Sequence, residues 1–450
     1  MLLTVIYLMV TLLLLILVHE SGHFVVARLC GVKVLRFSFG FGTALARWQD
    51  KRGTEYTWSL FPLGGYVKML DETDATISAD EHHLAFNNQS VWVRIAIVVA
   101  GPLSNFLFAF ILLWLSLVIG IKSLAPMIDQ VKPASIAANA GLQPKEEIIA
   151  LNDQSIQSWR DFQYGLMPFL GTSDTLLLTV RQLNNKTIRR VKLMLENWQI
   201  DPQKPDLLAS LGLVPFVPKI PPMVGKVLHQ SPAQLAGILS GDRIESVDGN
   251  RIDDWLELVS YVKKHAEKPI KIQLQRQHQS RSIVVLPGSI VVNGKLEGYL
   301  GMHSQPVNWP ADWLRWQHES PWGAVHLALK QTLDFTHATF RIFSRLVLGK
   351  LSLQTVSGPL GIAQGAGDSA RIGLVYYLVF LALLSISLGV LNLLPIPMLD
   401  GGHLLFMLIE IIKRRPLSEE VKSVATYLGL GLLMLMMLLG LVNDMNRLFG

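Results

Sequence analysis

Five consecutive residues near the amino terminus carry the side chains of a metal-dependent hydrolase. Positions 19–23 read His-Glu-Ser-Gly-His and follow an almost wholly apolar stretch that begins at Met1. On a helix, residues four apart share a face, so His19 and His23 can bind one Zn²⁺ while Glu20 lies beside it as a general base. A charged side chain at the bilayer centre costs about 2.5–3.5 kcal/mol on insertion scales, so this cluster indicates a site within the membrane. The alternative is a chance match, with both histidines at a membrane interface.

A zinc hydrolase needs a third protein ligand and one open position. Positions 392–403 read Asn-Leu-Leu-Pro-Ile-Pro-Met-Leu-Asp-Gly-Gly-His and interrupt the third apolar stretch of the chain with two prolines and two glycines. Irregular backbone at membrane depth is tolerated only where it is buried or lines a wet cavity. Asp400 is therefore the expected third ligand. His403 is the competing candidate, and its alternative is an interfacial histidine bonded to backbone.

The composition predicts a membrane protein with substantial soluble parts. Of 450 residues, 50% are hydrophobic and only 16% are charged, and the mean hydropathy is +0.36. Four apolar stretches approach the roughly 20 residues that cross a bilayer. The first lacks a basic amino-terminal region and a small-residue cleavage site, so we interpret it as a retained transmembrane helix rather than a signal peptide. The expected spans are residues 1–18, 91–121, 372–394 and 424–442.

Charge and cysteine content limit the partners and the orientation. The net charge of +6 is modest, and the sequence has no basic run interleaved with aromatic residues, so a nucleic-acid partner is not expected. A single cysteine, Cys30, excludes intramolecular disulfides. Basic residues follow the first span and precede the fourth, so both termini and the long insert are expected outside and the motif near the cytoplasmic side. These basic residues are Arg28, Lys33, Arg36, Arg47, Lys51, Arg52, Lys68, Lys413, Arg414, Arg415 and Lys422.

The long insert between the second and third spans contains an internal repeat. Two stretches match without gaps at an offset of 96 residues; for example, Trp159 matches Trp255. Two copies of one domain of about 90 residues are therefore predicted. The second copy, from Ser231-Pro232 through Gly241-Asp242 to Asp248-Gly249, resembles the PDZ domain pattern. The first copy is degenerate at the last two positions. Such domains bind extended chain ends by strand addition; the alternative is that the copies only brace or gate the membrane portion.

Taken together, the two motifs and the tandem repeat resemble the site-2 protease family of intramembrane zinc proteases over nearly the whole chain. The resemblance implies that His19, His23 and Asp400 bind Zn²⁺ and that Glu20 is the catalytic base. It implies that Asn392 lies near the substrate backbone, with Pro395 and Pro397 of the same motif also in substrate binding. The implied substrate is a single-pass membrane protein already shortened on its outer side, typically an anti-sigma factor of an envelope stress response, with remnant signal peptides as further substrates.

Three further segments have two interpretations each. Residues 37–42 and 59–68 are short apolar runs with glycines, including Gly64 and Gly65; the family implies hairpins that hold an extended substrate, and the alternative is an interfacial turn. Residues 101–105 open the second span and match a family motif, so Asn105 contacts substrate or belongs to a helix-packing notch of small residues. Residues 322–348 have helical amphipathic spacing and lie on the outer membrane surface or under the repeat. His82 and His83 are expected in a solvated loop.

The predicted fold is a polytopic α-helical membrane protein with four transmembrane helices and two tandem PDZ-like α+β domains inserted between helices 2 and 3. The resemblance implies a location in a bacterial inner membrane, and the expected partners are a lipid bilayer and a possible PDZ peptide ligand. A metal transporter is an alternative, but transporters usually have more, repeated spans. A catalytically inactive PDZ scaffold is the other alternative, although a scaffold does not require a base such as Glu20 between two metal ligands. The expected divisions are residues 1–125 (first core part), 126–220 and 221–305 (PDZ-like domains), 306–371 (amphipathic linker) and 372–450 (second core part).

Overall fold

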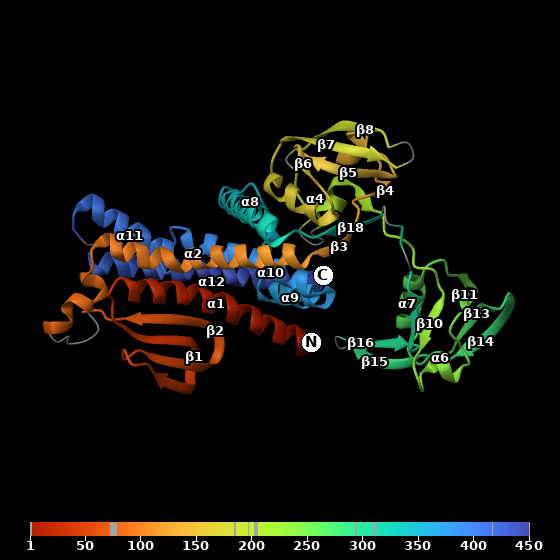
Figure 1. Cartoon of the computed structure of the whole chain (residues 1–450), viewed down its shortest axis with the longest axis horizontal. Helices are drawn as coiled ribbons and strands as arrows, with labels where there is room; N and C mark the ends of the chain where they lie inside the picture. Colours follow the sequence, from red (N-terminus) through yellow and green to blue (C-terminus); the bar gives the residue numbers. More distant parts are fainter. Residues whose placement is uncertain are drawn as a thin grey trace. The chain divides into compact units, whose positions relative to one another are not determined.

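The computed structural model describes residues 2–72, 79–183, 186–196, 198–201, 206–292, 295–307, 309–310, 313–415 and 417–449. It contains two compact units. Unit 1 comprises Met1–Val214 and Arg315–Gly450, and unit 2 comprises Pro215–Leu314. Unit 1 holds the long helices and the first copy of the repeat, and unit 2 holds the second copy (Figure 1).

Four helices of unit 1 are long and apolar enough to cross a membrane, so the predicted number of spans is confirmed. They are α1 (Leu2–Leu29), α2 (Val91–Ile119), α10 (Leu374–Leu393) and α12 (Glu419–Phe449). The predicted end of the first span at residue 18 is wrong, because α1 continues through the His-Glu-Ser-Gly-His motif. Polar residues end the apolar stretch but not the helix. The helix ends only near Gly31, whose φ of 81° is the left-handed conformation that terminates helices.

The third span ends where the proline-containing motif begins. After α10, residues 394–399 form an irregular connection, and a separate helix, α11 (Asp400–Lys413), starts at the predicted ligand. A proline removes a helix hydrogen bond and clashes with the preceding turn, so the two prolines at 395 and 397 favour the break at this point. Two glycines allow the new helix to pack against this connection: a Cβ at Gly401 would overlap the Leu394 carbonyl, and one at Gly402 would overlap the Ile396 carbonyl. The sequence Asp-Gly-Gly is thus required for Asp400 to lie this close to the end of α10.

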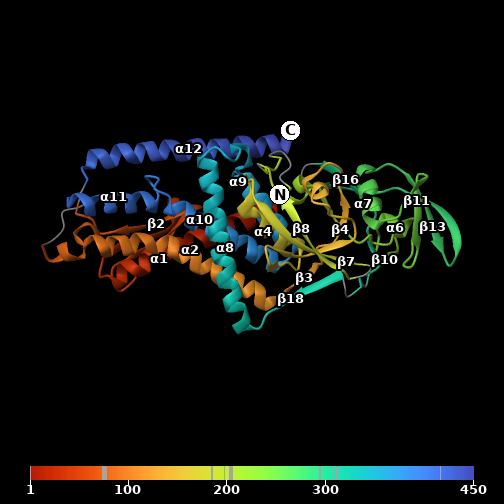
Figure 2. The same ribbon diagram turned by 90° about the horizontal axis from the view of Figure 1, so that it is seen from above.

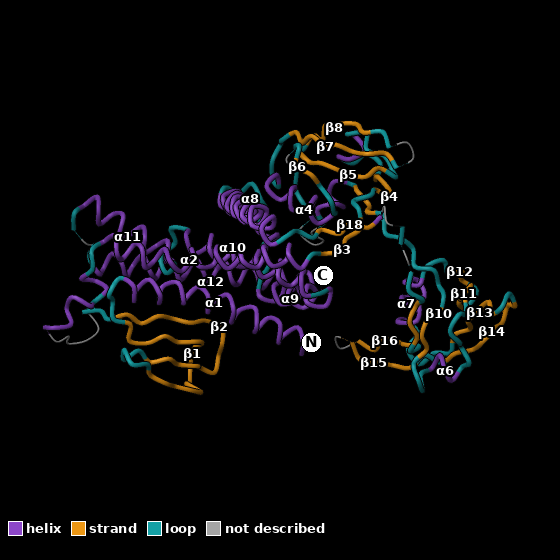
Figure 3. The backbone as a smooth tube through the Cα atoms, in the orientation of Figure 1, coloured by secondary structure: helices purple, strands orange, loops and turns teal. Residues whose placement is uncertain are grey.

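The two short glycine-containing runs belong to one antiparallel sheet. It consists of β1 (Val34–Gln49) and β2 (Glu55–Met69), and the register shifts repeatedly because residues 36–39 of β1 pair with two stretches of β2, residues 55–58 and 65–68. Both strands contact α1 (Figure 3). The segment that follows contains η1 (Ala79–Leu84) and η2 (Phe86–Asn88). His82 and His83 are exposed there, as predicted.

The predicted amphipathic segment is a single helix, α8 (Pro321–Val347). It runs across the membrane helices rather than along them (Figure 2) and contacts α2 and α10. The opposite side remains apolar and exposed, with Trp322, Leu329 and Phe340 each more than 45% accessible. Both interpretations of this segment are therefore compatible with its structure, since one face packs against protein and another is free to meet lipid.

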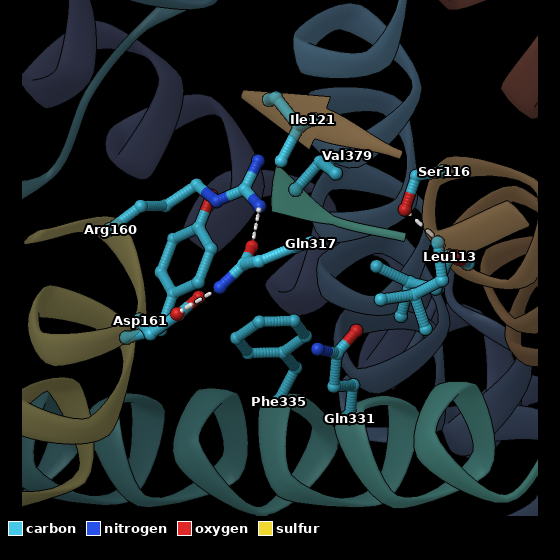
Figure 4. A pocket seen from close by; sticks show the side chains of 11 residues that line it. Leu113, Ser116, Ile121, Arg160, Asp161, Gln317, Gln331, Phe335 and Val379 are labelled. Atoms are coloured by element: carbon cyan, nitrogen blue, oxygen red, sulfur yellow. Dashed lines mark hydrogen bonds between the residues drawn. The ribbon is translucent and has the colours of Figure 1, made fainter. Parts of the chain in front are cut away.

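The first copy packs directly against this part of unit 1. Arg345 of α8 donates to the Pro168 carbonyl at 2.6 Å. Next to another part of α8, Gln317 accepts a hydrogen bond from Arg160 at 3.2 Å and donates to Asp161, in a pocket that Phe335 of α8 also lines (Figure 4). The remaining elements here are β3 (Ile121–Leu124), which pairs with β18 (Leu314–Gln317), η5 (Leu353–Thr355) and α9 (Pro359–Ile372).

The two copies share a central topology. Each contains a four-stranded sheet, with order β6-β5-β7-β8 in the first and β12-β11-β13-β14 in the second, and a separate two-stranded pair, β4-β9 in the first and β10-β17 in the second. The second copy has a further pair, β15-β16. The first copy comprises β4 (Ile128–Val131), α3 (Ile136–Asn139), β5 (Glu146–Leu151), β6 (Gln154–Ser155), α4 (Trp159–Leu166), η3 (Met167–Phe169), β7 (Thr175–Gln182), β8 (Ile188–Met194), α5 (Leu207–Leu211) and β9 (Leu213–Pro215). The second comprises β10 (Val224–Val227), α6 (Pro232–Leu235), β11 (Arg243–Val247), β12 (Asn250–Arg251), α7 (Trp255–Lys264), β13 (Ile270–Arg276), β14 (Gln279–Val285), β15 (Gly288–Val292), β16 (Lys295–Tyr299) and β17 (Met302–Ser304).

Equivalent residues make equivalent contacts at the offset of 96. Glu146 accepts a hydrogen bond from the Gln143 N–H at 2.9 Å, and Asp242 accepts one from the Leu239 N–H at 2.9 Å. Each carboxylate also pairs with an arginine of the four-stranded sheet in the same copy, although these arginines are not related by the offset: Arg189 of β8 in the first copy and Arg276 of β13 in the second. The degenerate sequence of the first copy therefore retains the buried ion pair, because Glu146 supplies the carboxylate that Asp242 supplies in the second.

Replacing Asp242 with asparagine is expected to lower the free energy of unfolding of unit 2 by about 3–5 kcal/mol, because Arg276 would lose its buried charged partner. Burial alone would raise the pKa of the Asp242 carboxyl, but hydrogen bonds from Arg276 and the Leu239 N–H lower it below its ordinary value. A carboxyl with a lower pKa in the folded state stabilises that state above the unfolded pKa of about 3.9, and this is lost as pH falls through the folded value.

Hydrogen exchange of β11 and β13 in the full chain, measured against urea, tests this effect. Asp253→Asn is the matched control, since Asp253 pairs with Arg251 at 2.8 Å on the surface, where ion pairs contribute about 0–1 kcal/mol. Equal exchange rates in the two variants would contradict the prediction.

Candidate metal centre

Three predicted ligands converge in unit 1. His19 and His23 lie one turn apart on α1, and Asp400 begins α11. Their Nε2, Nε2 and Oδ2 atoms form a triangle: 3.3 Å between the imidazoles, 3.2 Å from His19 to Asp400 and 3.4 Å from His23 to Asp400. Within the described residues, these three form the one group of His, Cys, Asp and Glu side chains arranged to hold a metal ion.

The size of this triangle fits zinc. Ligand atoms about 2.0–2.1 Å from a tetrahedral Zn²⁺ lie about 3.3–3.4 Å from one another. Asp400 Oδ2 is buried, yet it has no hydrogen-bond partner among the described residues. An unpartnered buried carboxylate oxygen is unfavourable unless a cation completes its surroundings. The donor set of two imidazoles and one carboxylate, with a fourth position left for water, therefore suits a catalytic zinc ion.

The surroundings of His23 fix which of its nitrogens can bind the metal. Its Nδ1 lies 2.8 Å from the Ile97 carbonyl of α2. A carbonyl oxygen only accepts, so Nδ1 carries the proton and Nε2 keeps its lone pair for the metal. A sequence pattern in α1 alone does not reveal this partner, because the acceptor is a backbone atom of another helix.

Two glycines allow α1 and α2 to approach closely at the site. A Cβ at Gly22 would overlap the Ala100 carbonyl, and a Cβ at Gly101 would overlap the Nε2 and Cε1 of His23. Small residues at helix crossings permit this approach in membranes. The expectation that residues 101–105 open the second span is wrong, because they lie ten residues inside α2, where they meet the histidines.

His403 does not join the ligand group. It lies one turn after Asp400 on α11, and its ring packs edge-on against Phe406 with centroids 6.3 Å apart. Its neighbour Gly402 contacts the preceding loop instead. The geometry therefore favours Asp400 over His403 as the third ligand.

Glu20 lies next to both the ligand group and the β-sheet. The Glu20 carboxylate interacts electrostatically with His23, His19 and Asp400. A Cβ at Gly65 of β2 would come within 3.2 Å of Glu20 Cγ, so the strand backbone runs next to this side chain. Gly64 instead packs against the Phe41 ring. The strand that the sequence predicts beside the site is thus present, with Gly65 as its point of contact.

The other predicted substrate residues differ in their surroundings. Asn392, at the end of α10, has its Nδ2 at 3.3 Å from His19 Nε2. Pro395 is exposed in the loop between α10 and α11, and a Cβ at Gly429 of α12 would overlap the Pro397 carbonyl. Asn105 is fully buried, with its Nδ2 at 3.1 Å from His19 Nδ1.

Two contributors to the site were not predicted as such from the sequence, the Ile97 carbonyl and Gly22. Gly22 could have been recognised from the motif itself. A glycine between two histidines at helical spacing has no side chain, so another helix can approach closely at that position. No side-chain pattern indicates the first.

Comparison with known proteins agrees with this geometry. The model of peptidase family M50 matches residues 7–436. The chain is 42% identical to the regulator of sigma-E protease RseP of Escherichia coli K12 over 434 residues, covering 96% of both chains. It is 41% identical to the regulator of sigma E protease of Salmonella typhi over the same share of each chain. It is 38% identical over 436 residues to a Vibrio cholerae protein that carries a zinc metalloprotease name, again covering 96% of both chains. The chain belongs to peptidase family M50, the site-2 protease family, and is a membrane zinc metalloprotease.

Proposed function

We propose that this enzyme cleaves the transmembrane segments of single-pass membrane proteins that have already lost their outer domains. His19, His23 and Asp400 hold the zinc ion in this proposal, and Glu20 is the general base. The observation that carries it is the triangle of ligand atoms, 3.2–3.4 Å on each side, formed by two helices that each belong to the membrane-spanning unit.

Glu20 is placed to move protons in this reaction. Zinc, when bound, polarises the scissile carbonyl and lowers the pKa of water from about 15.7 toward roughly 7. Glu20 accepts the proton that the attacking water loses and then donates it to the leaving nitrogen. It is suited to both steps because it lies beside the ligands without belonging to their triangle.

The strand next to Glu20 supports extended binding of the substrate. A helical segment hides its carbonyls in intrahelical hydrogen bonds, whereas a strand added beside β2 would present them. In this proposal Gly64 and Gly65 belong to the strand beside which that chain lies, and their lack of side chains lets this strand pack against Phe41 and Glu20. Asn392, Pro395 and Pro397 also border that chain in this proposal, and Asn392, which lies beside His19, supplies an amide near the scissile bond.

The relatives named as regulators of sigma-E support an anti-sigma factor as the substrate, with remnant signal peptides as further substrates. The proposed orientation places both termini and the two copies outside an inner membrane, because basic residues cluster in the short loops at the other side. The copies are PDZ-like domains, residues 126–220 and 221–305, between core parts 1–125 and 372–450 and joined to the second by 306–371. They exclude substrates with bulky outer domains, and a peptide ligand remains compatible with this role.

Removing unit 2 tests the exclusion. Joining Val214 to Arg315 by a short Gly-Ser linker leaves the first copy in place, which matters because its core includes Leu346 of α8 and Leu351. The variant is expected to cleave a substrate with an intact outer domain about as fast as the trimmed one, whereas the parent enzyme cleaves only the trimmed form. Cleavage of both substrates in purified, zinc-loaded enzyme is the measurement.

An unrelated folded domain of about 100 residues, inserted in place of unit 2, is the matched control. If exclusion is steric, this insertion restores discrimination between the two substrates. Discrimination that survives the excision would contradict a gate in unit 2. Discrimination that the inserted domain fails to restore would instead favour a peptide sensor.

A further inference from the structure

The side chain of Asn105 on α2 is a buried amide, and only one of its two polar atoms has a hydrogen-bond partner among the described residues. Its side chain is 0% exposed, and Nδ2 lies 3.1 Å from His19 Nδ1. Oδ1 is buried without a hydrogen-bond partner among the described residues. An unpaired buried acceptor is unfavourable by about 1–3 kcal/mol. A residue so enclosed contacts other side chains rather than a substrate.

The state of His19 decides which amide atom belongs next to it. His19 Nε2 faces the ligand atoms of His23 and Asp400, at 3.3 Å and 3.2 Å. A metal at their centre needs the lone pair of Nε2, so the proton of a neutral imidazole must be on Nδ1. Nδ1–H then requires an acceptor, and an amide nitrogen cannot supply one. A half-turn of the Asn105 amide about Cβ–Cγ exchanges its two atoms and brings Oδ1 to that position.

The backbone around Asn105 is arranged like that around the partner of the other histidine. Ile97, Gly101 and Asn105 recur every four residues on the face of α2 that meets α1. The Ile97 carbonyl accepts from His23, Gly101 leaves space for both imidazoles, and Asn105 reaches His19 one turn further along. Ser385 of α10 donates to the Asn105 carbonyl at 2.8 Å and anchors this position from a third helix.

We infer that Asn105 is a positioning residue whose Oδ1 accepts the Nδ1–H of His19 and holds its Nε2 toward the metal. The inference rests on the proposed metal centre and replaces a substrate contact as the role of this residue. Together with the Ile97 carbonyl, Asn105 gives each zinc-binding imidazole one fixed acceptor on α2. Outer partners of this kind typically change metal affinity about 10–100-fold.

Zinc affinity of the full chain in detergent, measured by competition with a chelator, tests the inference without using activity. Asn105→Leu, similar in size but without an acceptor, is expected to weaken Zn²⁺ binding about 10–100-fold. Asn105→Asp keeps an oxygen acceptor and is expected to remain within a few-fold of the parent. Ser104→Ala is the control, because Ser104 bonds the Val18 carbonyl at 2.8 Å on the same helix interface. It is expected to bind Zn²⁺ like the parent.

The pattern of results separates this inference from the metal centre itself. Asp400→Ala, measured in parallel, must lower zinc affinity if the centre is correctly assigned. Undiminished affinity in Asn105→Leu, with a diminished one in Asp400→Ala, would overturn only the role of Asn105. An Asn105→Asp variant as weak as Asn105→Leu, with an unchanged melting temperature, would also overturn it, since the amide nitrogen would then be the atom that matters.

Discussion

Glu20→Gln is expected to retain zinc while losing at least about 10²–10⁴-fold of the cleavage rate, the range that general base catalysis supplies. The glutamine has nearly the same size and leaves the triangle of His19, His23 and Asp400 intact. It cannot accept the proton of the attacking water, so only the chemical step is affected. Single-turnover cleavage of a model transmembrane substrate gives the rate, and elemental analysis of the purified protein gives the zinc content.

A glutamate remote from the centre provides the control for Glu20. Glu257→Gln makes the same chemical change on the exposed side of α7 in unit 2 and is expected to leave both rate and zinc content unchanged. Zinc loss in Glu20→Gln would make Glu20 a ligand instead of a base. A near-normal rate in that variant would remove the residue from the mechanism altogether.

Replacing Asp400 with alanine is expected to abolish cleavage and lower zinc affinity by more than the 10–100-fold typical of outer partners, since a ligand itself is lost. The folded protein without metal should tolerate this change, because Asp400 Oδ2 has no hydrogen-bond partner among the described residues. Thermal unfolding after chelation separates loss of the ligand from loss of the fold, and zinc affinity is measured on the same samples.

The neighbouring histidine is the matched comparison. His403→Ala alters the same first turn of α11 but removes a ring that packs on Phe406 outside the triangle. It is expected to keep most of the zinc affinity and most of the activity. The reverse order of the two variants would transfer the third ligand to His403.

Much of the fold was predictable because its signals are local. Four apolar stretches of sufficient length predict four spans, since the bilayer selects length and composition rather than particular neighbours. The identical contacts of Glu146 and Asp242 follow from a repeat that is visible as a fixed offset. The bounds of the helices were less predictable. The change from apolar to polar residues at position 19 ends the hydrophobic stretch, whereas α1 ends only at Leu29, near a glycine with positive φ.

The residues of the candidate site could also be predicted from the sequence. His19, Glu20 and His23 have helical spacing. Asp400 follows two prolines that interrupt an apolar stretch, and irregular backbone at membrane depth occurs only where it is buried or lines a wet cavity. Helical periodicity relates residues within a few turns, so these motifs could be recognised separately. Their meeting could not be derived from spacing, because the two segments are separated by most of the chain.

The tertiary structure alone decided how the imidazoles are held. Ile97 contributes a backbone carbonyl, which every residue possesses, and Asn105 contributes an amide whose partner lies on another helix. Likewise, the packing of Arg345 against the Pro168 carbonyl joins the first copy to α8 through groups that carry no pairing pattern in sequence. Such contacts depend on which helix faces meet and at what distance. A single sequence specifies them only through the summed packing of many apolar side chains, and each of these can pack against several alternatives.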